Sequence, residues 1–356
     1  MGRWNDETRG FREVRLQFLI LGARVLAQVN RHRLQPDYNR AMSSHPSLPV
    51  HRWWTSPYLL LSLTSLFWSL NWVIGRAVVG KVPPVALAYW RWALAVTIML
   101  PFAWPQIRRN WSLIRQHWKI IVLLAVVGTG FHNMFSYIGL NYTTATNGVM
   151  LNSAIPILIV VIGMLFFRLR TTSLQMLGVA VSLVGVLAII SKGHLETLAS
   201  FQFNIGDLIV LGSMVLWAVY TLMLKWRPSG IPPIAFLCVC GAVGVVAMTP
   251  VYAWELAAGK SIVWSWPVVG AFLYIGIFPS FLGYVFWNKG VEQVGPNVAG
   301  LFVHLMPVFG SLLAWLLLDE RLYWFHLAGI ALILSGIYLT TRKTATIVEP
   351  AAEGGE

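Results

Sequence analysis

About ten apolar segments, each of roughly 20 residues, follow one another between residues 57 and 341, and few charged side chains interrupt them. A helix needs about 20 apolar residues to cross the hydrocarbon core of a bilayer. Charged residues make up only 11% of the chain, against about 25% in a typical soluble domain. So few charges could not cover the surface of a water-soluble fold of this length. The sequence therefore predicts an all-α membrane protein with about ten transmembrane helices.

Short connections rich in turn-forming residues separate the predicted spans, which we expect near residues 57–79, 85–104, 119–140, 147–167, 173–191, 207–226, 232–254, 266–288, 296–318 and 324–341. Alternate connections concentrate positive charge, namely Arg108, Arg109, Arg115, Lys119, Arg168, Arg170, Lys225, Arg227, Lys289, Arg342 and Lys343. The opposite connections hold only Lys81, Lys192, Lys260 and Arg321. Because Lys and Arg are enriched in cytoplasmic loops, we expect a multi-pass protein of the cell inner (plasma) membrane with both termini in the cytoplasm.

The two ends of the chain differ from the membrane region. Residues 1–56 are basic, and their apolar stretch at 11–28 is interrupted by arginines and too short to span. This segment is either a helix on the cytoplasmic leaflet or the product of an over-long start, with natural synthesis beginning at Met42. Residues 342–356 are expected to form a cytoplasmic tail.

The net charge of +13 does not indicate nucleic-acid binding, because nine of the 26 basic residues lie in the first 52 residues and most of the others lie in short loops. Neither a cofactor nor a metal site is predicted. The two cysteines, Cys238 and Cys240, are two residues apart on a predicted helix and point about 200° away from each other, so they do not pair.

The two halves of the membrane region repeat one another. A shift of 149 residues places Trp68 on Trp217, Arg76 on Lys225 and Pro83-Pro84 on Pro232-Pro233. A shift of 151 places Gly139 on Gly290, Pro156 on Pro307, Arg170 on Arg321, Gly178 on Gly329 and Gly185 on Gly336. Each half holds five spans, so the second half must enter the membrane from the opposite face. We therefore expect two inverted five-helix repeats, at residues 57–191 and 207–341.

Several segments resemble the EamA domain of the drug/metabolite transporter superfamily. The opening of such a domain is similar to Phe67–Trp72 with Pro83-Pro84, and its later part to Leu140–Asn147, Pro156 and Leu177-Gly178. The ending is similar to Leu317–Leu322 and Ala328–Gly336. The resemblance extends from Pro57 to Arg342 and implies ten helices and a cargo of amino acids, other metabolites or toxic compounds, often exported. Leu169 stands where the second half has Glu320, so a matched pair of carboxylates is absent.

Inverted repeats are a recurrent solution to alternating access, with the substrate near the midplane between the repeats. We expect a secondary transporter or facilitator that moves small amphipathic metabolites outward, such as amino acids, aromatic or toxic compounds. No HExxH, GxSxG or aspartate pair lies in the spans, so no catalytic residue is assigned. A non-transporting membrane scaffold, a channel-like facilitator and a membrane-embedded enzyme remain alternatives. A homodimer is compatible with the sequence.

Helix breaks at equivalent places in both halves point to a binding site, because proline leaves a backbone carbonyl without its usual partner. Pro156 and Pro307 are equivalent, and Pro279 is matched by Gly128-Thr129-Gly130. The alternative is that these prolines only kink helices for packing. Polar and aromatic residues near the breaks are the candidate substrate-binding residues: Trp68, Asn71, Trp72, Asn133, Tyr137, Asn152, Trp217, Tyr220, Tyr284, Trp287, Asn288 and His304, with Ser153 beside them.

Two interpretations apply to each of four residues, one of which, His304, is also a candidate substrate-binding residue. His132 and His304 are either neutral and hydrogen bonded between helices, or act in proton transfer or substrate binding. Arg76 and Arg91 lie near the outer ends of their spans. They either extend to the headgroup region or attract carboxylate-bearing solutes to an outer vestibule.

Overall fold

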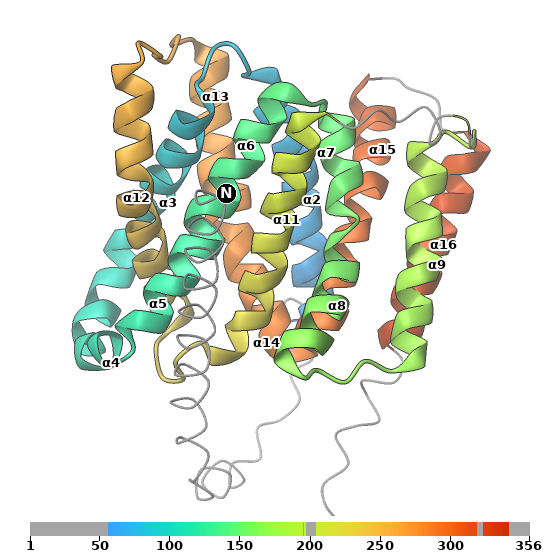
Figure 1. The fold of residues 1–356 in the computed structure, drawn as a ribbon, viewed down its shortest axis with the longest axis horizontal. Coiled ribbons are helices and arrows are strands. Elements are labelled where there is room, and N and C mark those ends of the chain that lie inside the picture. The colour runs from blue at the N-terminus through green and yellow to red at the C-terminus, as the bar shows by residue number, and fades with distance from the viewer. Residues whose placement is uncertain (1–55, 195, 197–203, 319–322, 342–356) are drawn as a thin grey trace, which may run out of the picture. The chain divides into compact units, whose positions relative to one another are not determined.

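The computed structural model describes residues 56–194, 196, 204–318 and 323–341. The predictions for the amino-terminal segment, for the carboxy-terminal tail and for Glu320 fall almost wholly on residues outside these ranges. The described residues form helices joined by short connections, with no β-strand among them (Figure 1). The predicted all-α fold is confirmed.

The first half contains five spans, of which the third and fourth are each built from more than one helix. The elements are α2 (Pro57–Ala77), α3 (Pro84–Arg109), the short α4 (Trp111–Gln116), α5 (Trp118–Leu124), η3 (Ala125–Phe131), α6 (His132–Tyr142), α7 (Ala145–Asn152), α8 (Ile155–Phe167) and α9 (Ser173–Ile190).

The second half follows the same plan. Its elements are α11 (Ile205–Met223), η4 (Leu224–Trp226), α12 (Pro233–Ala257), α13 (Trp266–Ile275), η5 (Gly276–Leu282), α14 (Gly283–Leu301), η6 (Phe302–His304), α15 (Leu305–Leu318) and α16 (Trp324–Thr341).

Nine helical stretches in the described part of the chain are long and apolar enough to cross a membrane. One of them, Trp266–Leu313, is 48 residues long and therefore too long for a single span. It is interrupted at Gly295, whose backbone has φ 79° and ψ 164°. Glycine adopts this conformation without steric cost, and Pro296 then starts the next helix. The break divides the stretch into the predicted eighth and ninth spans, which makes about ten.

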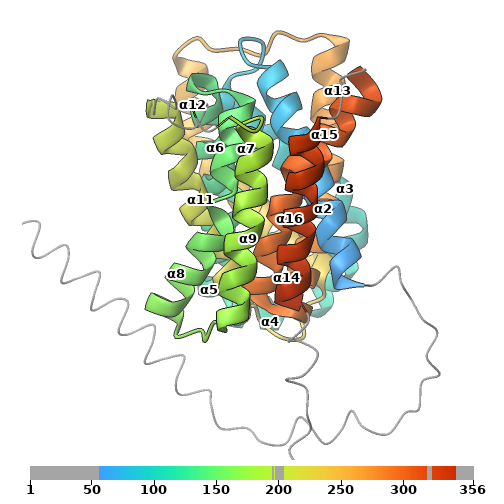
Figure 2. The ribbon, with the colours of Figure 1, turned by 90° about the vertical axis from the view of Figure 1, so that its right-hand side faces the viewer.

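The two halves pack against each other in exchanged pairs. Helix α2 packs on α14, and the equivalent helices α11 and α6 form the matching pair. Helices α3 and α12 pair with each other, as do α9 and α16. Helices α9 and α16 lie side by side in both Figure 1 and Figure 2. This exchange is the relation expected of two inverted repeats.

Equivalent glycines bring α9 and α16 into close contact. A Cβ atom on Gly178 would lie 2.6 Å from the carbonyl oxygen of Gly336, and one on Gly185 would lie 2.6 Å from that of Gly329. Small residues let membrane helices approach closely, because association there depends on van der Waals contact.

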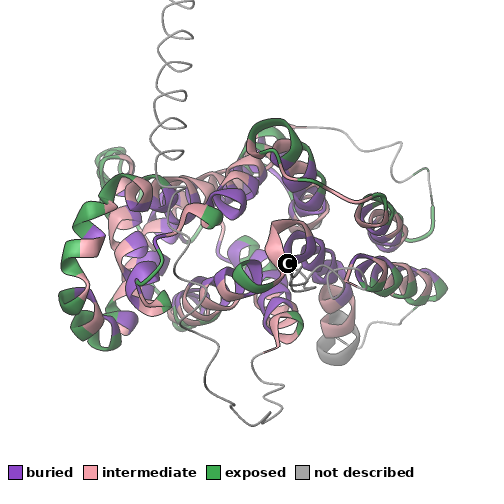
Figure 3. Cartoon of the chain, turned by 90° about the horizontal axis from the view of Figure 1, so that it is seen from below, coloured by how far each residue is buried: buried purple, intermediate pink, exposed green. Residues whose placement is uncertain are grey.

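Burial follows the helix faces. In Figure 3 the buried residues face neighbouring helices and the exposed ones lie on outward faces. Those outward faces are apolar: Phe102, Leu165 and Val246 are exposed. Large exposed side chains of this kind are suited to acyl chains. The protein is a multi-pass membrane protein surrounded by lipid.

Candidate functional site

The third and eighth spans are irregular at equivalent positions. Residues 125–131 (η3) and 276–282 (η5) are both π-helical, and the two segments coincide under the repeat shift of 151 residues. The sequence expected breaks here, because η5 contains Pro279 and η3 contains Gly128, Thr129 and Gly130. Such π-helical turns are rare and frequently lie at functional sites.

The fourth and ninth spans are also broken at matching places. The fourth divides between α7 and α8, just before Pro156, and the ninth passes through the 3₁₀ turn η6, just before Pro307. The carbonyl of Ser153 in the first break accepts a hydrogen bond from His304 Nε2 in the second, at 3.0 Å. Ser153 and His304 are repeat-equivalent, so the two breaks meet where the halves contact each other.

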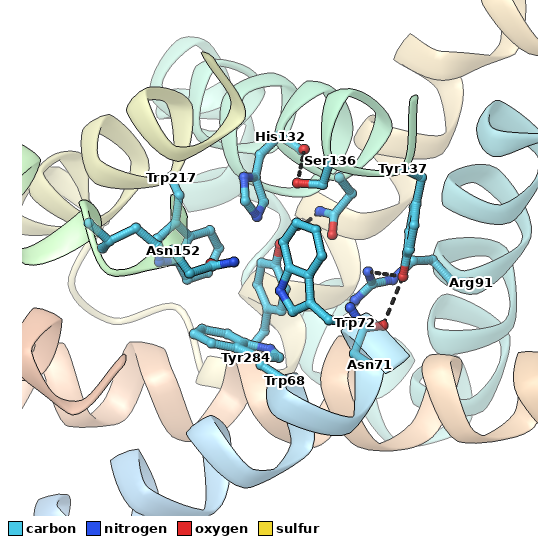
Figure 4. Close-up of a pocket in the computed structure, with 12 residues that line it drawn as sticks. Trp68, Asn71, Trp72, Arg91, His132, Ser136, Tyr137, Asn152, Trp217 and Tyr284 are labelled. Carbon is cyan, nitrogen blue, oxygen red and sulfur yellow. Dashed lines mark hydrogen bonds between the residues drawn. The ribbon is translucent and has the colours of Figure 1, made fainter. Parts of the chain in front are cut away.

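A central cavity of about 40 Å³ lies among these irregular segments. Its lining comprises Trp68, Asn71, Trp72, Arg91, His132, Asn133, Ser136, Tyr137, Asn152, Ile155, Trp217 and Tyr284, most of which are labelled in Figure 4. A water molecule needs roughly 10–15 Å³ of such space, so the cavity holds a few waters but no metabolite. A larger ligand would require the surrounding helices to separate.

Aromatic side chains close one side of the cavity. The equivalent residues Trp68 and Trp217 meet edge to face, with ring centroids 4.9 Å apart. Tyr284 packs on both rings, and Trp287 packs on both as well. Trp68 Nε1 donates to the carbonyl of Pro279 at 3.1 Å, which satisfies one carbonyl of the η5 irregularity. In contrast, Trp217 Nε1 is buried and has no hydrogen-bond partner among the described residues.

Amide and phenol groups form paired hydrogen bonds around the cavity. Tyr137 Oη donates to Asn71 Oδ1 at 2.8 Å, and Tyr220 Oη donates to Asn288 Oδ1, also at 2.8 Å. Asn133 Nδ2 donates to Tyr284 Oη at 2.8 Å, and these two residues are repeat-equivalent. The amides of the cavity wall thus have hydrogen-bond partners within the protein, as buried amides generally do.

Arg91 lies in the cavity wall and is only 3% exposed. Its Nε donates to Ser280 Oγ at 2.7 Å, and its NH1 donates to Tyr137 Oη at 2.8 Å. The expectation that it extends to the headgroups is therefore wrong for this residue. Arg76 differs, because it is exposed and donates to the carbonyl of Leu140 at 2.8 Å.

The two histidines have different surroundings. His132 lines the cavity, and its Nδ1 lies 2.8 Å from the carbonyl of Ser213. A carbonyl only accepts, so Nδ1 carries the proton and Nε2 of the neutral ring is left as an acceptor. His304 lies outside the cavity lining and is fully buried, with its ring nitrogens bonded to Ser182 and Ser153.

A second hollow, of about 440 Å³, lies at the end of the protein that the charge pattern assigns to the cytoplasm. It lies between the α11–α12 connection and the part of α14 next to the break at Gly295. Asn288 forms part of its wall. Arg227 and Glu292 form an ion pair at its edge, with 3.1 Å between NH1 and Oε2. Tyr220, through its bond to Asn288, connects this hollow to the aromatic cluster at Trp217.

The structure therefore distributes the predicted binding residues over four places. The cavity lining includes Trp68, Asn71, Trp72, Asn133, Tyr137, Asn152, Trp217 and Tyr284. Tyr220 and Trp287 pack against Trp217, Asn288 lines the inner hollow, and His304 stands apart. Sequence reasoning did not assign Ser136 or Ile155 to the site. Ser136 could have been found from its position one helical turn from His132 on the predicted third span.

A comparison with protein-family models decides the family. The model of the EamA-like transporter family matches residues 55–191 and again residues 204–342. The chain belongs to the EamA-like transporter family. The two matches correspond to the two halves of the structure.

Relatives of this EamA-like chain are also described as transporters. It is 26% identical to the uncharacterized transporter YyaM of Bacillus subtilis, over 79% of this chain and 92% of the relative. It is 28% identical to an uncharacterized transporter of Archaeoglobus fulgidus, over 80% of this chain and 97% of the relative. A solved structure, described as the crystal structure of a protein, has the same fold, with a TM-score of 0.65. The two chains are 19% identical, and the match covers 83% of this chain and 99% of the other. These findings support a transporter role for the EamA-like chain.

Proposed function

We propose that the protein is a secondary transporter or facilitator that carries small amphipathic metabolites across the plasma membrane by alternating access. In this proposal both termini lie in the cytoplasm, the two repeats occupy residues 57–191 and 207–341, and the moving parts are helix groups that each contain helices of both repeats. The transporter relatives and the inverted repeats support it.

The observation that carries the proposal is the pair of equivalent hydrogen bonds on either side of the aromatic cluster. Tyr137–Asn71 joins α6 to α2 in the half of the membrane that we assign to the outside. Tyr220–Asn288 joins α11 to α14 in the inner half. Helices α2 and α14 pack together, and so do α6 and α11. Each bond therefore bridges the same two helix groups, one at each end of the cavity.

The outer end is closed by buried carboxylates. Glu255 on α12 accepts hydrogen bonds from the backbone nitrogens of Val85 and Ala86, at 3.2 and 2.8 Å, at the start of α3. Asp207 at the start of α11 accepts from the hydroxyl of Thr143. The 440 Å³ hollow lies at the proposed inner end, and we therefore assign this conformation to a state closed outward and partly open inward. Exchanging the conformations of the two repeats would produce the outward-open state.

The cavity wall indicates the general nature of the substrate. Indole and phenol rings provide an apolar surface, while Asn71, Asn152 and the Trp217 N–H provide hydrogen-bonding groups. Such a mixture suits amphipathic solutes. Amino acids and aromatic or toxic compounds are the candidate classes of solute, and export is the expected direction.

Counterflow in proteoliposomes tests this proposal. The wild-type protein should exchange at least one labelled solute of a metabolite panel with saturable kinetics. Asn71→Ala and Asn152→Ala should reduce that exchange at least tenfold, since each removes a polar group from the cavity wall. Asn110→Ala is the matched control, because Asn110 follows the end of α3, is not among the cavity-lining residues, and its side chain donates only to the carbonyl of Gln106. Absence of counterflow for every solute in folded protein would contradict the carrier function.

A further inference from the structure

We propose that the central cavity selects solutes that carry one carboxylate on an apolar body, and that Arg91 binds the carboxylate. This inference rests on the carrier function proposed above and names the substrate class of the same site.

The charge of Arg91 has no counter-ion among the described residues. Both of its hydrogen-bond partners are neutral hydroxyls that have already committed their own protons. Ser280 Oγ donates to the carbonyl of Ile275 at 2.7 Å, and Tyr137 Oη donates to Asn71. The only ion pair in the described part of the chain is Arg227–Glu292, at the inner end. An uncompensated buried cation is costly, and a ligand carboxylate would compensate it.

The second repeat shows that the fold does not need a cation at this position. Cys240 is equivalent to Arg91, and Thr129 is equivalent to Ser280. Thr129 Oγ1 donates to the carbonyl of Cys240 at 2.9 Å, so η3 and α12, the equivalents of η5 and α3, are joined by a neutral contact. The arginine is therefore specific to the first repeat, whose copy of this position faces the cavity.

The rest of the cavity wall defines the remainder of the ligand. In the view of Figure 4, Arg91, Tyr137 and Asn71 gather at one end, Trp217 lies at the other, and Trp72 lies between them. No Asp or Glu is among the lining residues, so a second, positive charge on the ligand would lack an ionic partner. The arrangement favours a monocarboxylate with a flat apolar or aromatic group over a cation or a neutral solute.

The test compares three ligands of matched shape: 3-phenylpropionate, 3-phenylpropan-1-ol and 3-phenylpropylamine. Binding to purified protein in nanodiscs is measured by calorimetry. The acid should bind about 10- to 100-fold more tightly than the alcohol or the amine, the range expected for charge-assisted hydrogen bonds. Arg91→Gln should remove this preference, and Arg91→Lys should keep part of it. Arg76→Gln is the matched control, because Arg76 is exposed and lies outside the cavity lining. The Arg76→Gln protein should prefer the acid to the same extent as the wild type.

The preference for acid over alcohol separates ligand binding from a purely structural role. If Arg91 only joined helices, Arg91→Gln would weaken both ligands equally. That result would overturn the assignment, as would equal binding of acid and alcohol to the wild type, or no binding of the acid. The wild-type comparison needs no variant and stands even if Arg91→Gln does not fold. Counterflow of neutral solutes that persists in Arg91→Gln would reject the substrate class and leave the carrier function intact.

Discussion

Asn71 and Tyr220 occupy equivalent positions in the two repeats, and each is half of the same kind of hydrogen bond with the roles exchanged. Asn71 accepts from Tyr137, whereas Tyr220 donates to Asn288, and both distances are 2.8 Å. An asparagine–tyrosine bond thus joins the two helix groups at each end of the central region. Because one bond can loosen while the other holds, the pair gives a physical basis for opening one end at a time.

The contact between α9 and α16 should be sensitive to a single methyl group. A Cβ on Gly336 would lie 2.7 Å from Ser182 Cβ and close to the Gly178 carbonyl. Gly336→Ala should therefore lower the free energy of unfolding by about 1–3 kcal/mol. Gly212→Ala is the control, since no atom lies within 4 Å of its new Cβ, and it should be neutral or slightly stabilising. Thermal unfolding in one detergent compares them, and equal melting temperatures would contradict this packing.

Removing the outer carboxylate should expose the outer end. Glu255→Ala leaves two backbone N–H groups at the start of α3 without acceptors, a loss of about 1–2 kcal/mol. A cysteine at the exposed position Lys81 should then react faster with an impermeant maleimide. Glu292→Ala removes a carboxylate that is 62% exposed, at the other end, and should leave this rate unchanged. Equal rates in both variants would count against Glu255 as an outer closure.

His304 should be important for stability and not for pH dependence. Both ring nitrogens bond to neutral groups, and the ring lies outside the cavity lining. His304→Ala leaves the buried Ser153 carbonyl without a hydrogen-bond donor. The free energy of unfolding should therefore fall by about 1–3 kcal/mol. Residual transport should keep the wild-type pH profile. A changed profile in a variant of normal stability would instead support a role in proton transfer.

The sequence predicted the fold and much of the cavity because both follow from local, readable features. Apolar length gave the spans, and the repeat shift gave the equivalence of Trp68 and Trp217, which meet in the structure. The prolines and glycines located the breaks in advance. The extra residue of a π-helix, in contrast, has no sequence signature at η3 beyond its glycines.

The direction of the Arg91 side chain is a part of the site that the sequence could not predict. Depth along a span can be estimated from sequence, and Arg91 is near the outer end of its span. Depth does not tell whether a side chain points to lipid or to the interior, which depends on how α3 is rotated against α12 and η5. Helix α3 has apolar residues on several faces, so the rotation is set by tertiary packing alone. Arg76, at a similar depth, points outward.

Alternate opening of the two ends is measured with one pair of spin labels at each end. Exposed positions provide spin-label sites: Tyr142 on α6 with Trp266 on α13 at the outer end, and Phe166 on α8 with Gln293 on α14 at the inner end. Helix α13 continues through η5 into α14, and α8 packs on α11. The labels are introduced as cysteine pairs in wild type, Tyr137→Phe and Tyr220→Phe.

Double electron–electron resonance on these pairs is the most direct test. Tyr137→Phe removes the outer bond and should raise the outward-open population about fivefold, for a loss of about 1 kcal/mol. The outer distance should lengthen while the inner distance shortens. Tyr220→Phe should shift both distances in the opposite directions. If the two distances lengthen together, or neither changes, the hydrogen bonds do not control alternate opening and the account is contradicted.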